Sequence, residues 1–231
     1  MSKVIALIPA RGGSKGIKQK NLALLLGRPL IDYSISAARS SGVIDDVYVS
    51  SDDDVILSVA LSLGAKTVKR NPALALDESP TDPLIAEFIT HEKLSASDII
   101  VLLQPTSPLR MPHHINDSLL QFRAHPSCRS LISVYEVNNK YLKAYIAGGE
   151  YLTPLAGLNT SYSRRQDLPS VVMPNGALYI FTVAEFLRDG KIPRSQIISY
   201  VMSEAESLDI DTPSDLAAAE QALQQRQVSN E

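Results

Sequence analysis

Short runs of apolar residues alternate along the chain with longer segments in which apolar residues recur every three or four positions. The short runs predict seven strands, at residues 4–8, 46–50, 66–69, 98–103, 130–135, 176–181 and 197–201. The longer segments between the early runs predict helices over residues 29–40, 53–63, 83–94 and 112–123. This alternation predicts an α/β fold with a mainly parallel, Rossmann-like sheet that helices cover on both faces.

The alternation of strands and helices stops between residues 138 and 174. Residues 141–151 predict a hairpin around a Gly-Gly pair, and a polar, basic loop follows it. We therefore expect a single domain over residues 1–231, in which residues 138–174 form an excursion from the core that could cover the site or meet a partner subunit. Beyond it, apolar and acidic residues alternate over 208–211 and predict another strand, with a last helix from about residue 212.

A glycine-rich basic loop follows the first predicted strand directly. Six basic residues, Lys3, Arg11, Lys15, Lys18, Lys20 and Arg28, precede the first acid, Asp32. Glycine lets the backbone N–H groups approach phosphate oxygens, and Arg and Lys side chains neutralise the charge. The loop matches neither the Walker A motif nor G-x-G-x-x-G. A solvated basic turn is the alternative, but a position at the end of a strand favours a polyphosphate site.

Asp209 and Asp211 are the second candidate feature. In a strand, residues i and i+2 point the same way, so both carboxylates would face one site while Leu208 and Ile210 face the core. Two hard oxygen ligands on one face suit Mg²⁺ shared with substrate phosphates. The alternative is an alternating edge strand that leads into a helix capped by Thr212.

Polar residues also follow other predicted strands. The strand at 98–103 ends in a proline-rich turn from Gln104 to Arg110, which presents amide, hydroxyl and guanidinium groups, or serves only as a helix-capping loop. Asp52 is placed to cap the helix predicted from residue 53, although its carboxylate could also reach the site. The basic loop after residue 162 could bind an anionic substrate or be a solvated surface loop.

The bulk composition narrows the class of protein. With 45% hydrophobic residues, 20% charged residues and a net charge of -3, the chain is typical of a globular protein and unlike a nucleic-acid binder. No apolar run reaches the length that a membrane span needs. The single cysteine, Cys128, has no partner for an internal disulfide, which fits a cytoplasmic protein. The four histidines show no metal-ligand spacing, so we expect them at the surface or at helix caps.

These motifs together resemble those of a known family. Residues 8–16 (IPARGGSKG), followed by Lys20 and Asn21, resemble the signature loop of the acylneuraminate cytidylyltransferases, or CMP-sialic acid synthetases, which include CMP-legionaminic acid synthases. The resemblance continues at residues 49–52 (VSSD), 102–110 (LLQPTSPLR), 165–169 (RQDLP), 174–180 (PNGALYI) and 208–212 (LDIDT). The blocks occur in order over nearly the whole chain.

The resemblance implies transfer of CMP from CTP to the anomeric hydroxyl of a nine-carbon 2-keto acid sugar, with Mg²⁺ as cofactor and pyrophosphate as product. It also implies a cytoplasmic homodimer and a role in lipopolysaccharide or capsule biosynthesis. The catalytic residues that it implies are Arg11, Lys20 and Asp211, and the metal ligands are Asp209 and Asp211. The implied nucleotide-binding residues are Arg11, Gly13, Ser14, Lys15, Lys20, Asn21 and Thr81. The implied sugar-binding residues are Gln104, Lys143, Arg165, Gln166 and Tyr179.

Two departures from the family pattern concern the sugar. Met173 stands where many members have an arginine, and residues 191–193 (KIP) stand where some members have paired aromatic residues. N-acetylneuraminate, legionaminate and related nonulosonates are therefore all open. The alternatives to this function are a CMP-Kdo-type synthetase and a non-catalytic nucleotide-binding module, and the presence of Lys20, Asp209 and Asp211 argues against the second.

Overall fold

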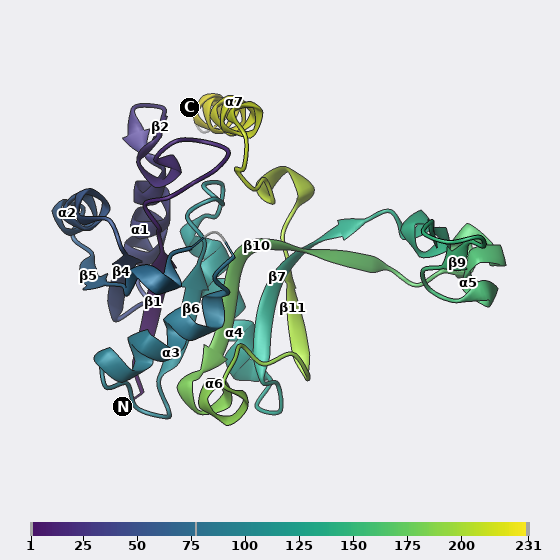
Figure 1. Ribbon diagram of the computed structural model, residues 1–231, viewed down its shortest axis with the longest axis horizontal. Coiled ribbons are helices and arrows are strands. Elements are labelled where there is room, and N and C mark those ends of the chain that lie inside the picture. The colour runs from purple at the N-terminus through teal and green to yellow at the C-terminus, as the bar shows by residue number, and fades with distance from the viewer. Residues whose placement is uncertain (1, 77, 230–231) are drawn as a thin grey trace.

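A seven-stranded sheet forms the centre of the protein in the computed structural model, which describes residues 2–76 and 78–229 (Figure 1). Its strands lie in the order β11 (Ile197–Val201), β7 (Ser130–Val137), β10 (Val171–Thr182), β6 (Ile99–Leu103), β1 (Val4–Pro9), β4 (Asp46–Ser51) and β5 (Lys66–Lys69). Neighbouring strands are parallel except where β10 pairs, antiparallel, with β6 and β7. The predicted mainly parallel sheet is confirmed, and the largest change in a strand boundary is the start of β10 at Val171 instead of residue 176.

Helices cover both faces of this sheet because the side chains of each strand alternate between two cores. Val4, Ala6 and Ile8 of β1 point into a core that α1 (Leu30–Ser40), α2 (Asp54–Ser62) and α4 (Pro112–Ala124) close. Ile5 and Leu7 point into the opposite core, which α3 (Thr81–His91) and α6 (Val183–Asp189) close. The predicted covering of both faces is therefore confirmed. Among the described residues, no helix has the length and apolar character that crossing a membrane requires.

A third, smaller core joins residues 25–30 to the C-terminal part of the chain from residue 210 onward. Helix α7 (Pro213–Ser229) buries Ala219 against Leu25 of β2 (Leu24–Leu25), which pairs with β3 (Arg28–Pro29). Ile210, just before α7, is fully buried in the same cluster. Burial of one such side chain contributes about 1.5–3 kcal/mol, so this core fixes residues near position 210 beside the first loop.

Residues 208–211 do not form the predicted strand. The alternation of burial is present, since Ile210 is 0% exposed and both Asp209 and Asp211 are exposed. The segment instead takes its hydrogen bonds from loops: the Ile210 N–H donates to the Thr106 carbonyl at 2.9 Å, and the Ile210 carbonyl accepts from the Lys20 ammonium at 2.8 Å. The alternation of buried and exposed residues here arises because the Ile210 side chain is buried, and not because the segment belongs to a sheet.

The start of α2 differs from the prediction by one residue. Asp53, not Asp52, caps this helix, since its Oδ1 accepts from the N–H of Val55 at 2.7 Å and of Ile56 at 3.3 Å. Asp52 is then free to turn toward the first loop, where it accepts the N–H of Gly12 at 3.0 Å. The end of β4 thus supports the loop that follows β1.

Residues 138–174 form an arm that extends away from the sheet on the long ends of β7 and β10 (Figure 1). It holds the paired two-residue strands β8 (Tyr145–Ile146) and β9 (Thr153–Pro154) and the short helix α5 (Leu158–Tyr162). The hairpin predicted over residues 141–151 is displaced, because Asn138 caps a 3-10 helix at Asn139–Lys143 and the returning strand begins only at Thr153.

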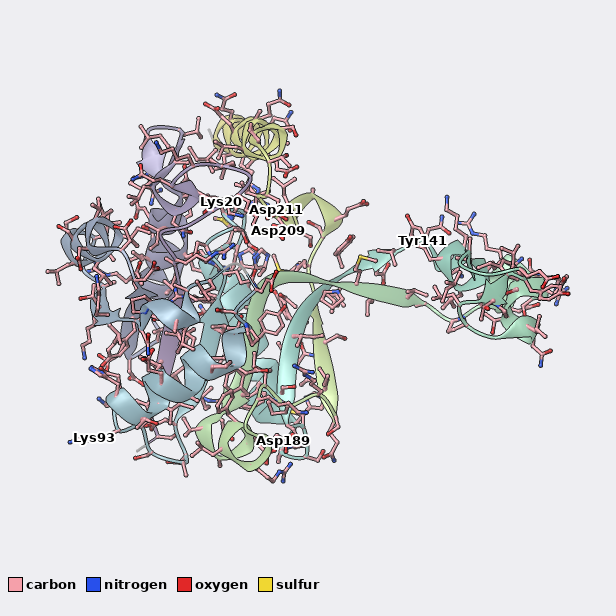
Figure 2. The ribbon with its side chains drawn as sticks, in the orientation of Figure 1. Lys20, Lys93, Tyr141, Asp189, Asp209 and Asp211 are labelled. Carbon is pink, nitrogen blue, oxygen red and sulfur yellow. The ribbon has the colours of Figure 1, made fainter. Side chains whose placement is uncertain are left out.

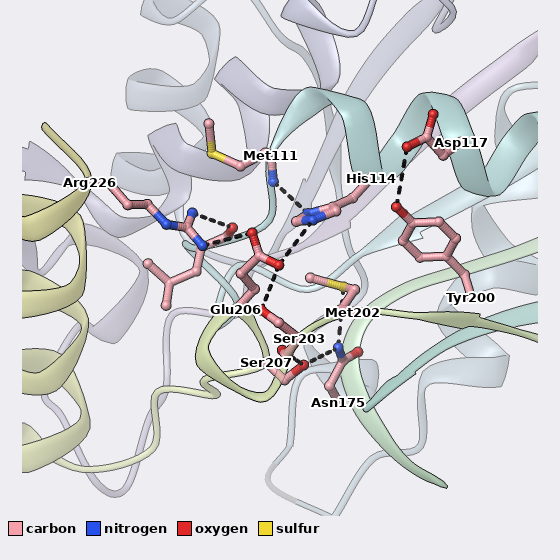
Figure 3. A network of polar contacts seen from close by, with 11 residues as sticks. Met111, His114, Asp117, Asn175, Tyr200, Met202, Ser203, Glu206, Ser207 and Arg226 are labelled. Carbon is pink, nitrogen blue, oxygen red and sulfur yellow. Dashed lines mark hydrogen bonds and ion pairs between the residues drawn. The ribbon is translucent and has the colours of Figure 1, made fainter. Parts of the chain in front are cut away.

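A polar clamp, made of His114, Ser203, Glu206 and Arg226, holds the segment after β11 against α4 and α7 (Figure 3). The Glu206 carboxylate accepts from Arg226 Nη2 at 2.9 Å and from the Ser203 hydroxyl at 2.7 Å, and His114 Nε2 lies 3.6 Å away. His114 Nδ1 accepts the Met111 N–H at 3.0 Å, so the neutral ring carries its proton on Nε2, facing Glu206. Burial, the main cause, lowers the pKa of His114 to about 4.

We expect the protein to lose stability as the pH falls from about 6.5 toward 4. Unfolded His114 takes up a proton near its ordinary pKa of 6.5, whereas the folded side chain does so only near 4, so the unfolded state binds more protons in this window. The loss should reach about 2 kcal/mol at pH 5 relative to pH 8. His113, Arg110 and Arg226 add to the effect of burial, and Glu206 opposes it.

The variant His114→Asn tests this assignment, because the Asn Oδ1 can still accept the Met111 N–H but does not titrate. Denaturant unfolding of both proteins between pH 5 and pH 8 should give a flatter stability profile for the variant. The Glu206 carboxyl should cause part of the pH dependence of stability in both proteins. The Ser203 hydroxyl and the neighbouring cations lower its pKa, although burial acts in the opposite direction. Parallel profiles would remove His114 as the source.

Candidate active site

The carboxyl ends of β1, β5 and β6 open into a cleft of about 540 Å³. Its lining brings together eight of the residues that the sequence assigns to the site: Arg11, Ser14, Lys15, Lys20, Asn21, Thr81, Gln104 and Asp211. Among the described residues, four cationic side chains line it, Arg11, Lys15, Lys20 and Arg70, against one carboxylate, Asp211. The cleft is therefore suited to a polyanion.

Backbone and side-chain contacts fix the glycine-rich loop at the edge of this cleft. Asn21 is buried, and its side-chain amide donates to the Arg11 carbonyl at 2.9 Å, closing the loop on itself. Gly16 packs so closely on the Asp211 carbonyl that no side chain fits there, whereas Gly13 has open space beside it. Gln19 takes a left-handed conformation with φ at 51° and turns the chain so that Lys20 faces the cleft.

Lys20 connects the first loop with the segment before α7 (Figure 2). Its ammonium lies 3.0 Å from the Asp211 carboxylate and 2.8 Å from the Ile210 carbonyl, and its side chain is only 17% exposed. The basic loop and the acidic segment, which lie 190 residues apart in the sequence, therefore meet at one point. A polyphosphate in the cleft would lie between the cations of the loop and the two aspartates.

The two aspartates form an acidic pair beside Lys20 (Figure 2). The pKa of the Asp209 carboxyl is raised, mainly by partial removal from solvent and further by the negative charge of Asp211, while Lys20 opposes the shift. Two carboxylates that repel each other next to a polyanion cleft are stabilised by a hard divalent cation. The carboxylates of Asp209 and Asp211 are therefore a donor set that fits Mg²⁺.

Arg70 is a cleft residue that the sequence analysis missed. It follows β5, is 6% exposed, and donates from Nη2 to the Ser50 carbonyl at 2.8 Å, while its Nε has no partner among the described residues. Burial lowers its pKa, and the nearby charge of Arg11 acts in the same direction. The one signal in the sequence was its position directly after a predicted strand, the same signal that drew attention to Arg11.

A second cavity of about 350 Å³ adjoins the cleft. The two share Pro80, Thr81 and Gln104, and the second one continues past Tyr179 to an apolar wall that includes Ile192 and Pro193. The phenol of Tyr179 has a raised pKa, caused mainly by burial and also by the charge of Asp209. Tyr179 thus lies between the acidic pair and the second cavity.

The remaining sugar-site residues lie on the arm. Arg165 and Gln166 line a separate cavity of about 460 Å³ with residues from the ends of β7 and β10, and Lys143 lies in the 3-10 helix Asn139–Lys143. These three residues are not part of the lining of the main cleft. One chain therefore does not bring its arm residues to its own cleft (Figure 1).

Among the described residues, His113, His114 and Glu206 form the one group of three or more His, Cys, Asp or Glu side chains whose ligand atoms lie close enough together to hold a metal ion. The hydrogen bonds that His114 and Glu206 already make disfavour a metal ion at this cluster. His114 would have to bind through Nε2, yet its Nδ1 already accepts a backbone N–H, so the ring would need to lose both protons. Glu206 is also occupied by Arg226 and Ser203. We therefore assign these side chains to the polar clamp.

Comparison with known proteins agrees with this geometry. The sequence model of the family described as Cytidylyltransferase matches residues 5–231, which is nearly the whole chain. The chain belongs to the cytidylyltransferase family. Within it, this chain is similar to proteins named N-acylneuraminate cytidylyltransferase, as the sequence motifs indicated.

Three such relatives illustrate the degree of similarity. The protein from Streptococcus agalactiae serotype III is 34% identical over 92% of this chain, form A from Danio rerio is 36% identical over 95%, and the protein from Escherichia coli O18:K1:H7 is 33% identical over 94%. The alignments cover 51%, 50% and 51% of those proteins. The chain thus spans about half the length of these curated relatives.

Solved structures share the fold of this cytidylyltransferase. CMP:2-keto-3-deoxy-manno-octonic acid synthetase complexed with CTP superposes with a TM-score of 0.75 at 18% identity, covering 97% of this chain and 100% of the other. 4-Diphosphocytidyl-2C-methyl-D-erythritol synthase gives a TM-score of 0.68 at 13% identity, with 96% and 99% covered. At these identities the likeness establishes the Rossmann-like α/β fold.

Gly16→Ala should disturb the meeting point of loop and acidic segment even without a ligand. The new Cβ would stand well under 3.0 Å from the Asp211 carbonyl oxygen, which is backbone and must shift. We expect a lowered melting temperature and weaker CTP binding, measured by thermal shift and calorimetry. Gly148→Ala, whose Cβ meets nothing within 4 Å, is the matched control and should behave as wild type. Wild-type CTP affinity in Gly16→Ala would contradict the close packing.

Proposed function

We propose that this protein transfers CMP from CTP to the anomeric hydroxyl of a sialic-acid-like nonulosonate and releases pyrophosphate. The observation that carries the proposal is the meeting of Lys20 and Asp211 at a cationic cleft, with Asp209 close enough to feel the charges of both, in a chain of the cytidylyltransferase family. Relatives named N-acylneuraminate cytidylyltransferase support the choice of sugar class.

The nucleotide occupies the main cleft in this proposal. Arg11, Lys15 and Lys20 neutralise the triphosphate, and the backbone around Gly13 and the Ser14 hydroxyl donate to phosphate oxygens. Asn21 and Thr81 contact the nucleoside, as the resemblance implies. Arg70, which is 6% exposed, adds a further cation to the lining of the same cleft.

Mg²⁺ is the cofactor in this proposal, and Asp209 and Asp211 would hold it. When bound there, it neutralises charge that develops on the phosphates as the bond to pyrophosphate breaks. The anomeric oxygen attacks the α-phosphorus in line with the departing pyrophosphate, so one P–O bond forms as another breaks, and the proton of the anomeric hydroxyl is released to solvent. Lys20 and Arg11 stabilise the negative charge on the leaving group from the loop side.

The sugar site is composite in this proposal. Gln104 and Tyr179 line the second cavity from the body of the chain, whereas Lys143, Arg165 and Gln166 lie on the arm. The arm also exposes large apolar side chains, with Tyr151 80% and Tyr162 82% exposed. A homodimer in which each arm packs on the neighbouring subunit buries this apolar surface and brings the arm residues to the other cleft.

A second candidate is a synthetase for an eight-carbon acid sugar. The structural similarity to CMP:2-keto-3-deoxy-manno-octonic acid synthetase favours it as a related activity. Both candidates use CTP, so they differ in the acceptor. We place the reaction in the cytoplasm, which the single Cys128 without a disulfide partner supports.

A pyrophosphate-release assay with CTP and Mg²⁺ tests the proposal. N-acetylneuraminate, legionaminate and 2-keto-3-deoxy-manno-octonate serve as acceptors, and we expect turnover with a nine-carbon acid to exceed that with the eight-carbon acid. Asp211→Asn should lower kcat by about 100-fold or more at nearly unchanged melting temperature, because its exposed ion pair adds little stability. Asp54→Asn, which breaks the exposed pair with Lys69, is the control and should keep full activity. No turnover with any acceptor would reject the proposal.

Mixing two inactive variants tests the composite site. Arg165→Ala impairs the arm, and Asp211→Ala impairs the body of the chain. If arms are exchanged, each mixed dimer holds one intact site, so random mixing should restore about a quarter of wild-type activity. Subunit exchange followed by the pyrophosphate assay measures this. Absence of recovery, with mixed dimers present by mass spectrometry, would place each arm at its own subunit's cleft.

A further inference from the structure

Strand β10 carries a wide bulge where it leaves the sheet for the arm. Pro174 lies opposite Val134 and Tyr179 opposite Ile132, so residues 175–178 on β10 face the single residue Ser133 on β7. Beyond the bulge, β10 pairs with β6 in the body of the sheet, and before it β10 and β7 run out into the arm. The bulge is therefore the base of the arm (Figure 1).

Asn175 organises this bulge from inside. Its side chain is 5% exposed, and its Oδ1 accepts from the Ser133 hydroxyl at 2.6 Å and from the Ala177 N–H at 3.1 Å. The Ser133 hydroxyl in turn accepts the Leu178 N–H at 2.8 Å. These bonds replace the ladder that the extra residues interrupt, so the bulge has one defined shape.

The amide nitrogen of Asn175 contacts residues that follow β11 and lie outside the sheet. Its Nδ2 donates to the Ser207 hydroxyl at 2.9 Å and lies 3.2 Å from the Met202 sulfur (Figure 3). The Ser207 hydroxyl in turn donates a hydrogen bond to the Ser203 carbonyl at 2.8 Å, which closes the turn that leads to Asp209 two residues later. One buried amide thus joins the base of the arm to the acidic segment.

The bulge also touches the sugar side of the site. Gly176 has φ at 73°, and a Cβ there would lie 3.3 Å from Gln104 Oε1, so the glycine lets the Gln104 side chain pack on the backbone. Buried Arg110 donates from Nη1 to the Ala177 carbonyl at 2.5 Å and to the Gln104 carbonyl at 3.1 Å. Residues 175–178 of β10 therefore contact Gln104 and Arg110 on one side. On the other side they contact Ser207, which lies two residues before Asp209.

We propose that Asn175 is a positioning residue that sets the acidic segment, and so the carboxylates of Asp209 and Asp211, relative to the base of the arm. The inference rests on the proposed function, because it assigns those carboxylates to Mg²⁺. Ile210 anchors the segment at one end through its burial and its bond to Thr106, and the Asn175–Ser207 bond anchors the other end. Loss of the second anchor lets the acidic pair move while leaving every ligand present.

Ser207→Ala tests this most cleanly, because it removes the link at the acidic segment and leaves Asn175 to hold the bulge. Tyr200→Phe is the matched control, since it removes a hydroxyl that bonds to Asp117 on α4 from the neighbouring strand β11. Mn²⁺ affinity in the presence of CTP, measured from the free-ion signal by electron paramagnetic resonance, reports on the carboxylates without turnover. We expect Ser207→Ala to weaken Mn²⁺ binding by about 10-fold and to lower kcat, with KM for CTP and the melting temperature close to those of the control.

Asn175→Ala should weaken Mn²⁺ binding at least as much as Ser207→Ala does. If Asn175→Ala does not fold, Ser207→Ala still decides the test. Mn²⁺ affinity in Ser207→Ala equal to that of Tyr200→Phe would overturn the proposal. A wild-type protein that binds CTP and Mn²⁺ but transfers no CMP would instead reject the proposed function, and the comparison of metal affinities would still decide the role of Asn175.

Discussion

The position of the Lys20 ammonium between the Ile210 carbonyl and the Asp211 carboxylate is the contact on which the site depends. Its contribution to stability is small: Asp211 is 73% exposed at its side chain, and such ion pairs contribute at most about 1 kcal/mol. Burial of Ile210 holds the segment with a larger free energy, about 1.5–3 kcal/mol. Hydrophobic anchoring therefore determines that the acidic segment stays beside the first loop, and Lys20 determines which way its polar groups face.

The chain has a net charge of -3, yet its main cleft is cationic. The reason is that arginine side chains are buried in the cleft wall and behind it. Arg70 is held against the Ser50 carbonyl, and Arg110 lies fully inside, bonded to carbonyls and to Ser34 rather than to a carboxylate. Burial lowers the pKa of Arg110 to about 9, so the group stays charged at neutral pH. Two buried cations whose hydrogen bonds, among the described residues, go to carbonyls and a hydroxyl leave a positive field that a polyanion in the neighbouring cleft can satisfy.

Local periodicity was enough to predict the sheet and the position of the glycine-rich basic loop at the end of β1. Each strand of a mostly parallel sheet is apolar on both faces, so the runs at β1, β4 and β6 stand out from their surroundings. Residues 208–211 misled the same reasoning, because a loop with one buried isoleucine and two outward aspartates has the period of a strand. Arg70 was missed because a single arginine after a strand has the same local pattern as a solvated one, and only its tertiary contacts bury it.

The arm shows a second kind of limit to sequence reasoning. Its polar and basic composition marked it as an excursion, but its direction follows from the bulge at residues 175–178, where four residues face one and the strand turns out of the sheet. That geometry takes Arg165 and Gln166 away from the cleft of their own chain and leaves aromatic side chains such as Tyr151 in solvent. A monomer would expose this apolar surface, and in the proposed composite site it would hold only part of the sugar-binding residues. Because one buried amide, Asn175, joins the base of this arm to the segment that carries Asp209, the proposed packing of the arm on a second subunit would be coupled to the geometry of the acidic pair.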